Sequence, residues 1–221
     1  MSIRRNPVAE RRSLIREWGY SATRAVARLA ALLLFRIRCE GRRNYPAAGG
    51  GLICSNHQSH LDPPLVGLTC DRRLNYLARK TLFTFPPFRW LIEFFDAIPI
   101  DRDGMGLEGI KETLRRLKRG ELVLIFPEGR RSTDGRVQPL KPGFCALARR
   151  GRVPLVPVGI AGAFEAWPRE AKLRRPGVIH VHIGEPMSPE FTEQLDDEAL
   201  VAELERRIRE CVERAAAGRR R

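Results

Sequence analysis

The sequence predicts an α/β fold, with a largely parallel central sheet flanked by helices and preceded by an N-terminal amphipathic helix that associates with a membrane. From about residue 50 onwards, short apolar runs alternate with longer helical patterns, which is typical of a parallel sheet covered by helices. Residues 1–43 hold eleven arginines against three glutamates, which sets this segment apart. Four glycines and a proline over residues 41–51 form a breaker-rich connection between the two parts.

The first predicted element is an amphipathic helix over residues 9–35. One side of its helical wheel is apolar and includes Trp18. The other side is basic and carries Arg12, Arg16, Arg24 and Arg28. Such a pair of faces, with a tryptophan on the apolar side, is typical of a helix that lies in a membrane interface. The alternative is a surface helix that packs on the protein's own core and keeps its charged face in water.

The rest of the chain is predicted to form one compact domain. We therefore divide the sequence into a basic membrane-anchoring segment, residues 1–45, and a folded domain, residues 46–221. Consecutive apolar residues predict strands over residues 52–54, 74–78, 97–100, 121–126, 153–160 and 178–183. Helical patterns predict helices over residues 63–70, 107–119, 144–150 and 197–217. The clearest pattern is the stripe of leucines and isoleucine over residues 107–119.

Composition limits the class of partner and the compartment. The 221 residues carry a formal net charge of +14, so the partner is expected to be anionic: nucleic acid, a membrane surface or a phosphorylated substrate. No run reaches 18 apolar residues, so no spanning helix is predicted, and the N-terminus lacks the apolar stretch of a secretory signal. Five scattered cysteines, with no CxxC pair, indicate a reducing compartment and neither disulfides nor a zinc site.

The first motif with chemical character directly follows the strand over residues 52–54. His57 and Asp62 lie five residues apart across a turn between strand and helix, so the carboxylate can fold back onto the imidazole. A histidine held by an aspartate is a general base. Two alternatives remain open from spacing alone. Asp62 precedes two prolines and fits a helix N-cap, and His57, His60 and Asp62 could supply part of a metal site.

Two further strand ends carry charged residues. After the strand over residues 121–126, a glycine turn with Glu128, Gly129, Arg130, Arg131 and Ser132 can present guanidinium and backbone donors to a phosphate. After the strand over residues 97–100 come Asp101 and Arg102, which are uninformative by themselves. An ordinary charged loop is the alternative interpretation of either segment.

Taken together, these motifs are far more specific than any one of them. A His-x-x-x-x-Asp after a strand, an Ile-Asp-Arg about 40 residues on, a Phe-Pro-Glu-Gly-x-Arg-Ser about 25 later and a Val-Pro-Leu-Val-Pro block starting at residue 153 occur in this order. This chain thereby resembles the glycerolipid acyltransferase family, and within it the bacterial 1-acyl-sn-glycerol-3-phosphate (lysophosphatidate) acyltransferases. The similarity runs from about residue 51 to residue 186.

The resemblance implies a role for each matching residue. His57 would deprotonate the acceptor hydroxyl, which attacks an acyl thioester, and Asp62 would orient it. Arg102, Glu128, Gly129 and Arg131 would surround the glycerol phosphate of the acceptor. Residues 46–221 would then be an acyltransferase domain. One departure concerns Arg130, because the family usually has threonine between the glycine and the arginine; an extra guanidinium there fits an anionic head group or alters the choice of acceptor.

The resemblance also implies the partners. No metal or resident cofactor is expected; the cosubstrate is an acyl thioester of acyl carrier protein or coenzyme A, and the acceptor is a lyso-lipid. The product is phosphatidic acid for phospholipid biosynthesis, made at the cytoplasmic face of the cell membrane by a peripheral protein on an anionic surface. The alternatives are an acyltransferase for another lyso-lipid, such as a lysophospholipid or lyso-ornithine lipid, and a basic module that binds nucleic acid. No nucleic-acid-binding signature supports the latter.

Two features stand outside these motifs. His180 and His182 are two residues apart on a predicted strand, so they share a face and could chelate a metal, although no cysteine or carboxylate cluster accompanies them. Ordinary strand positions are the favoured interpretation. The aromatic-rich run over residues 82–95 fits either a core, an acyl-chain pocket or contact with lipid.

Overall fold

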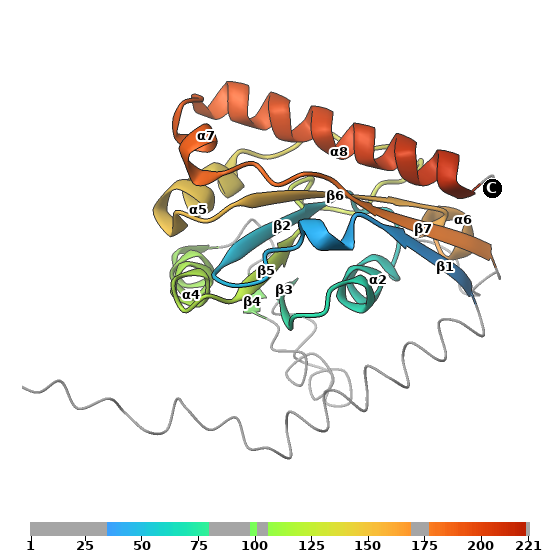
Figure 1. The fold of residues 1–221 in the computed structure, drawn as a ribbon, viewed down its shortest axis with the longest axis horizontal. Helices are drawn as coiled ribbons and strands as arrows, with labels where there is room; N and C mark the ends of the chain where they lie inside the picture. Colours follow the sequence, from blue (N-terminus) through green and yellow to red (C-terminus); the bar gives the residue numbers. More distant parts are fainter. Residues whose placement is uncertain (1–34, 80–97, 101–105, 169–176, 220–221) are drawn as a thin grey trace, which may run out of the picture.

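The computed structural model describes residues 35–79, 98–100, 106–168 and 177–219, and these build a seven-stranded sheet with helices on both faces (Figure 1). The strands are β1 (Phe35–Glu40), β2 (Gly51–Ser55), β3 (Leu74–Arg79), β4 (Ile98–Ile100), β5 (Leu122–Ile125), β6 (Leu155–Ala161) and β7 (Gly177–Ile183). The helices are η2 (Arg42–Asn44), α2 (Asp62–Thr69), α4 (Gly106–Lys118), α5 (Gly143–Gly151), α6 (Ala163–Ala166), α7 (Pro189–Glu193) and α8 (Asp197–Arg219).

The sheet is largely parallel, as the sequence predicts. The strand order is β1-β7-β6-β2-β5-β3-β4, and every neighbouring pair is parallel except β6 and β7. The chain leaves β2 through α2 towards β3, whereas it leaves β5 through α5 towards β6 on the other side of β2. The loops after β2 and β5 therefore separate at a point where the connections change direction, which is where open α/β sheets bind ligands.

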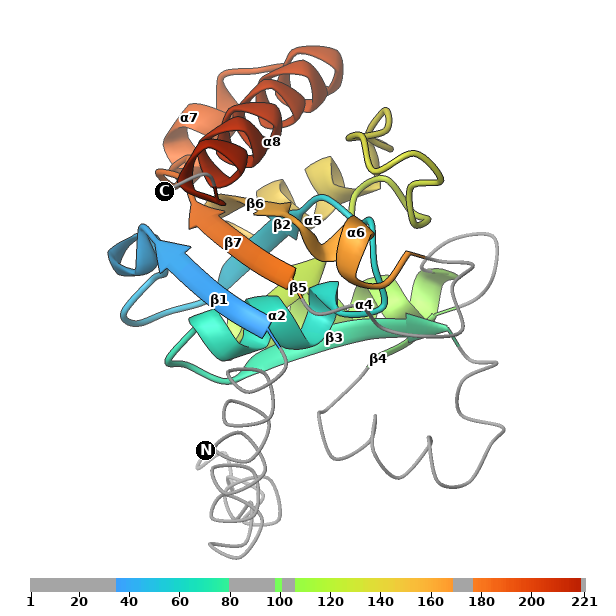
Figure 2. The same ribbon diagram turned by 90° about the vertical axis from the view of Figure 1, so that its right-hand side faces the viewer.

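Apolar side chains cover both faces of the sheet, and each face has its own core cluster. Helices α4, α5 and α8 pack on one face, where Phe144, Leu204 and Ile208 are buried. Helices α2 and α6 pack on the other, where Leu65, Val66 and Ala163 are buried. Figure 2 shows α8 lying along β6 and β7. Burial on both faces explains why β2, β5 and β6 read as continuous apolar runs in the sequence.

Strand β1 is the main element that sequence analysis did not predict. It pairs in parallel with β7 at the edge of the sheet, from Phe35 opposite Gly177 to Glu40 opposite His182. The sheet therefore begins inside the segment 1–45 that the sequence assigns to the membrane anchor. Exposed Arg36 and Arg38 alternate with half-buried Ile37, which is an edge-strand pattern. Because this short alternation lies in an arginine-rich segment, the sequence alone did not identify it as a strand. The short helices α6 and α7 were also not predicted.

The N-terminal helix predicted over residues 9–35 lies outside the described residues, apart from Phe35, which is the first residue of β1. The aromatic run over residues 82–95 and the predicted site residue Arg102 lie outside them as well. Within the part of the chain that is described, no helix is long and apolar enough to span a bilayer.

Candidate active site

The loop after β2 is anchored to β6 by two amide side chains. Asn56 donates from Nδ2 to the carbonyl oxygen of Ile160, 3.1 Å away, and accepts at Oδ1 from the amide of the same residue, 2.8 Å away. Gln58 donates to the same carbonyl at 2.6 Å. Because Asn56 and Gln58 are buried, these bonds fix the two residues that flank His57. The sequence did not predict a role in the site for either residue. The only signal for such a role was that both are polar and lie in the loop directly after a buried strand.

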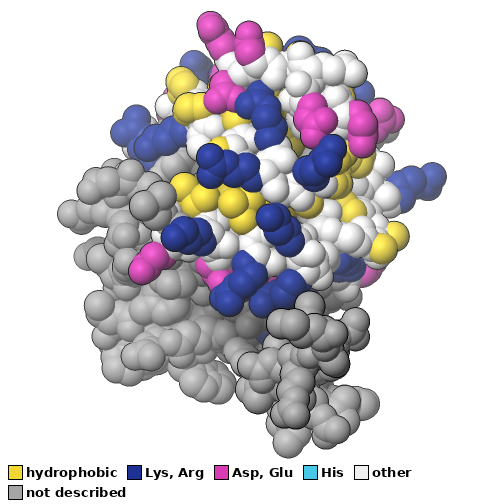
Figure 3. Space-filling view, turned by 90° about the vertical axis from the view of Figure 1, so that its left-hand side faces the viewer, with side chains coloured by type: hydrophobic (Ala, Val, Ile, Leu, Met, Phe, Trp, Pro, Cys, Tyr) yellow, Lys and Arg dark blue, Asp and Glu magenta, His cyan; other side chains and the backbone are white. Residues whose placement is uncertain are grey.

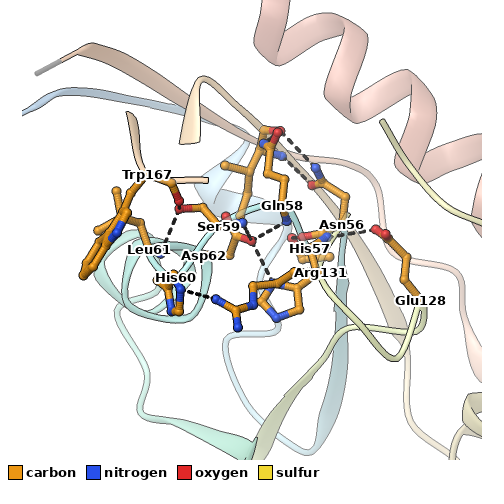
Figure 4. Close-up of polar contacts among 12 residues, drawn as sticks. Asn56, His57, Gln58, Ser59, His60, Leu61, Asp62, Glu128, Arg131 and Trp167 are labelled. Atoms are coloured by element: carbon orange, nitrogen blue, oxygen red, sulfur yellow. Dashed lines mark hydrogen bonds and ion pairs between the residues drawn. The ribbon is translucent and has the colours of Figure 1, made fainter. Parts of the chain in front are cut away.

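Asp62 organises this loop through one carboxylate oxygen. Its Oδ2 accepts from the backbone amides of Gln58 at 2.6 Å and Ser59 at 2.7 Å, and it lies 2.8 Å from Nδ1 of His57. Asp62 is fully buried. It is the first residue of α2, and its carboxylate accepts from amides that precede the helix instead of capping the helix. The N-cap interpretation of Asp62 is therefore wrong, and the dyad geometry is present (Figure 4).

The geometry fixes the tautomer of His57. An ionised carboxylate only accepts hydrogen bonds, so Nδ1 carries the proton and Nε2 is left as the basic nitrogen. The imidazole also stacks on Phe126 from the loop after β5, with ring centroids 4.0 Å apart and planes inclined by 19°. The side chain is 18% exposed, so it faces the surface rather than the core. This arrangement lets His57 take a proton from a bound hydroxyl group.

Glu128 ties the loop after β5 to the loop after β2. Its Oε1 accepts from the backbone amide of His57 at 2.8 Å, and its Oε2 accepts from the amide of Gln138 at 3.3 Å. Burial raises the pKa of this carboxyl group to about 7, although the two amide hydrogen bonds oppose the rise. A second tie runs from the amide of Ser132 to the carbonyl of His57, at 2.7 Å. Glu128 thus acts on the site through the backbone of His57.

Gly129 has a left-handed backbone conformation that favours glycine, and it lies close to the side chain of Lys141. Its φ angle is +73°, and a Cβ there would lie 3.1 Å from Cε and 3.2 Å from Nζ of Lys141. The turn therefore brings the ammonium group of Lys141 over the glycine. Lys141 is a cation next to the site that sequence analysis did not assign, although it lies in the segment between the third and fourth motifs.

Arg131 reaches back to the first motif. Its Nη1 contacts Nε2 of His60, and its neighbour Ser132 is bonded to the backbone of His57. The predicted grouping of Arg131 with the His57 loop is therefore seen in the structure. Arg102, the other arginine expected at the acceptor phosphate, lies outside the described residues, so its place stays a prediction.

The metal alternatives find no support in the geometry. In the described ranges, no three His, Cys, Asp or Glu side chains are arranged to hold a metal ion. His60 faces Arg131 instead of His57 and Asp62. His180 and His182 lie on β7 opposite Glu40, whose oxygens are 3.8 Å and 3.7 Å from them, and burial lowers the pKa of His182. These histidines belong to the packing of β1, β7 and α8.

Comparisons with known proteins agree with this site. A family model described as Acyltransferase matches residues 36–161, a range that includes His57, Asp62 and Arg131. The 1-acyl-sn-glycerol-3-phosphate acyltransferase of Bacillus subtilis is 32% identical over 180 residues, which cover 79% of this chain and 87% of that protein. The protein of the same name from Pseudomonas aeruginosa is 31% identical over 169 residues, covering 75% of this chain and 63% of that one.

Longer relatives and a solved structure extend the comparison. The chain spans about half the length of the chloroplastic 1-acyl-sn-glycerol-3-phosphate acyltransferase BAT2 from Brassica napus, 54% of which is matched at 26% identity over 188 residues. The crystal structure of the 1-acyl-sn-glycerophosphate acyltransferase PlsC from Thermotoga maritima superposes with a TM-score of 0.82 at 26% identity. That match covers 94% of this chain and 83% of the other.

Proposed function

Because this chain belongs to the acyltransferase family, we propose that it transfers a fatty acyl group from an acyl thioester to the sn-2 hydroxyl of 1-acyl-glycerol-3-phosphate, giving phosphatidic acid. The observation that carries the proposal is the His57–Asp62 pair at the carboxyl end of β2, fixed by Glu128 against the loop that bears Arg131. A general base and a phosphate-binding arginine on adjacent loops are what acylation of a phosphorylated glycerol requires.

His57 acts as the general base. A hydroxyl group is a poor nucleophile at neutral pH, so Nε2 of His57 removes its proton while the oxygen attacks the thioester carbonyl. Asp62 stabilises the imidazolium that forms and does not itself take a proton. The tetrahedral intermediate then collapses, the carbon–sulfur bond breaks, and the imidazolium returns the proton to the leaving thiolate. The proton that His57 takes from the hydroxyl group ends on the thiol, so the reaction needs no further reactant.

The acceptor phosphate is assigned to Arg131 and Arg102, with Lys141 as a third cation beside Gly129. A guanidinium donates two parallel hydrogen bonds to phosphate oxygens, whereas an ammonium acts as a point charge. Replacement of Arg131 by alanine should therefore raise the apparent KM for the acceptor more than the KM for the thioester. Arg150 is exposed on α5, outside the motifs, so Arg150→Ala is the control for loss of one positive charge.

We further propose that the protein works as a peripheral protein at the cytoplasmic face of the membrane. Its lyso-lipid acceptor lies in a bilayer, and the N-terminal segment offers an apolar face with Trp18 and a basic face for anionic lipids. The acyl donor is a thioester of acyl carrier protein or of coenzyme A, which both present the same reacting carbonyl.

One assay tests the function. The purified full-length chain is given a radiolabelled acyl thioester, of either carrier, and a panel of acceptors: lysophosphatidate, other lysophospholipids and a lyso-ornithine lipid. We expect labelled phosphatidic acid with lysophosphatidate, at a kcat/KM at least about tenfold above the other acceptors, since only this acceptor offers a terminal phosphate to the arginines. Preference for an acceptor without that phosphate would overturn the assignment.

A further inference from the structure

Arg131 touches a residue of the first motif that the proposed mechanism leaves without a role. Nη1 of Arg131 lies at hydrogen-bond distance from Nε2 of His60, although 71 residues separate the two in sequence (Figure 4). A guanidinium is always protonated and has only donors, so the imidazole nitrogen must accept. In this contact His60 is therefore neutral and carries its proton on Nδ1.

The imidazole of His60 is itself supported from the opposite side. Its ring lies against that of Trp167, with centroids 5.1 Å apart and planes tilted by 35°. Ser59 donates from Oγ to the carbonyl of Trp167 at 2.6 Å, and the amide of Ser59 donates to Asp62. The position of His60 is thus fixed relative to the same carboxylate that orients His57. A side chain bound by His60 therefore has a defined position relative to His57 and Asp62.

A neutral partner has a specific advantage for a phosphate-binding arginine. A carboxylate in this place would orient the guanidinium but would also cancel much of its charge, which weakens attraction for a phosphate. An imidazole accepts one of the five N–H donors and, being neutral, adds no negative charge beside the guanidinium. His60 thus orients Arg131 without placing a carboxylate next to it.

We propose that His60 is a positioning residue for the acceptor: it aims the Arg131 guanidinium at the phosphate of 1-acyl-glycerol-3-phosphate and thereby sets the distance between that phosphate and His57. This inference rests on the proposed function, in which Arg131 binds the acceptor phosphate. It assigns to His60 an effect on acceptor binding and on the choice of phosphorylated acceptors, with no part in proton transfer.

Three substitutions at His60 test separately the contributions of its hydrogen-bond-accepting nitrogen, its aromatic ring and its lack of charge. His60→Phe keeps a ring against Trp167 but cannot accept from Arg131, and should raise the acceptor KM about tenfold, with kcat and donor KM within about twofold of wild type. His60→Gln keeps a neutral acceptor and should stay within about threefold of the wild-type KM. His60→Glu keeps an acceptor but adds a negative charge, and should raise the KM at least as much as His60→Phe. Because His60 is exposed, the melting temperatures should change little.

A double-mutant cycle distinguishes failure of this inference from failure of the proposed function. In an Arg131→Ala background, His60→Phe should have no further effect on the acceptor KM. If Arg131→Ala leaves that KM unchanged, the phosphate role of Arg131 in the proposed function is wrong. If Arg131→Ala raises it but His60→Phe does not, or acts equally in both backgrounds, only the positioning role is overturned. Equal KM values for His60→Phe and His60→Gln, or a wild-type KM for His60→Glu, would overturn it as well.

Discussion

A single carboxylate oxygen, Oδ2 of Asp62, connects the imidazole of His57 to the backbone of the loop that carries it. Two amides hold the carboxylate in place, so its direction towards Nδ1 of His57 does not depend on side-chain freedom. His57 is fixed through its own amide too, by Glu128 from the loop after β5. Residues of two loops therefore fix the orientation of the His57 imidazole.

The first prediction concerns the base itself. His57→Ala should lower kcat by at least about 100-fold, because the acceptor hydroxyl loses the group that removes its proton. Rates are measured with saturating thioester and lysophosphatidate. Asp62→Asn should also lower kcat, since an amide cannot stabilise the imidazolium. Circular dichroism and the melting temperature of His57→Ala serve as the fold control. A His57→Ala protein with near wild-type turnover would show that another group is the base.

The second prediction concerns the pH dependence of stability. The pKa of Glu128 is about 7 in the folded protein, against an ordinary value of 4.5, so the folded state binds more protons between these values. The stabilisation from Glu128 is present in full below about pH 4.5 and is lost as pH rises through about 7, by up to about 3 kcal/mol. Glu128→Gln has no carboxyl group to titrate, so its free energy of unfolding should fall less over this range.

Denaturant unfolding of both proteins between pH 4.5 and 8 measures this difference. All other titrating groups are common to the two proteins, so the difference of the two curves isolates Glu128. Parallel curves would mean that the carboxyl group of Glu128 titrates near its ordinary value in the folded state.

At the scale of elements, β6 links the core to the site. Its residue Ile160 holds Asn56 and Gln58 through backbone hydrogen bonds, and α8 lies against the opposite side of the sheet from α2. We therefore expect the position of the His57 loop to depend on how closely α8 packs on β6. The contact is closest at Gly159, where a Cβ would lie 2.2 Å from the backbone carbon of Cys211 and the backbone nitrogen of Val212.

The third prediction follows from that contact. Gly159→Ala should destabilise the protein by roughly 1–3 kcal/mol, because backbone atoms of α8 can make room only if the helix shifts. The shift should also lower kcat, since Ile160 is the next residue along β6. Gly177→Ala is the matched control in a neighbouring strand, where no atom of the described residues lies within 4 Å of the added methyl group. If the two variants had equal free energies of unfolding in chemical denaturation, α8 would be able to shift without loss of stability.

At the scale of the whole molecule, positive charge occurs both in the N-terminal segment and on the folded domain. Residues 1–34 hold seven arginines against two glutamates. Lys and Arg side chains are also spread over the face of the domain shown in Figure 3. On the helices of the domain, Lys111 and Lys118 of α4 and Arg150 of α5 are exposed. A basic surface on the domain predicts that part of any attraction to anionic lipid remains after the N-terminal segment is removed.

The fourth prediction separates these contributions. Deletion of residues 1–34 should strongly reduce sedimentation with phosphatidylglycerol-containing vesicles, because the apolar face is lost along with about 1 kcal/mol per basic residue at the surface. The residual binding should disappear at high salt. The deletion must stop before Phe35, because β1 belongs to the sheet and its loss would expose the edge of β7.

Phosphatidylcholine vesicles provide the control for charge in this experiment, and activity towards a short-chain, water-soluble acceptor provides the control for folding. If the truncated protein and the full chain sediment with anionic vesicles to the same extent, the membrane contact lies on the folded domain. That result would refute the N-terminal anchor.

The sequence by itself determined the α/β class, most strands and helices and the segments that carry the chemistry. Each of these depends on local patterns: continuous apolar runs for β2, β5 and β6, a 3.6-residue period for α4, and charged residues directly after strands for the His57 and Arg131 loops. The ordered motifs then pointed to the family, and relatives bear out the function.

Only the tertiary structure decided what depends on contacts between distant segments. Glu128, assigned to the acceptor from its motif, is bonded to the backbone of His57, 71 residues away, and Asn56 and Gln58 reach Ile160 over more than 100 residues. Strand β1 gains its place only through its pairing with β7. Such contacts are set by the order of strands in the sheet, which hydrophobic periodicity does not encode, because periodicity says which face of an element is buried but not against which partner.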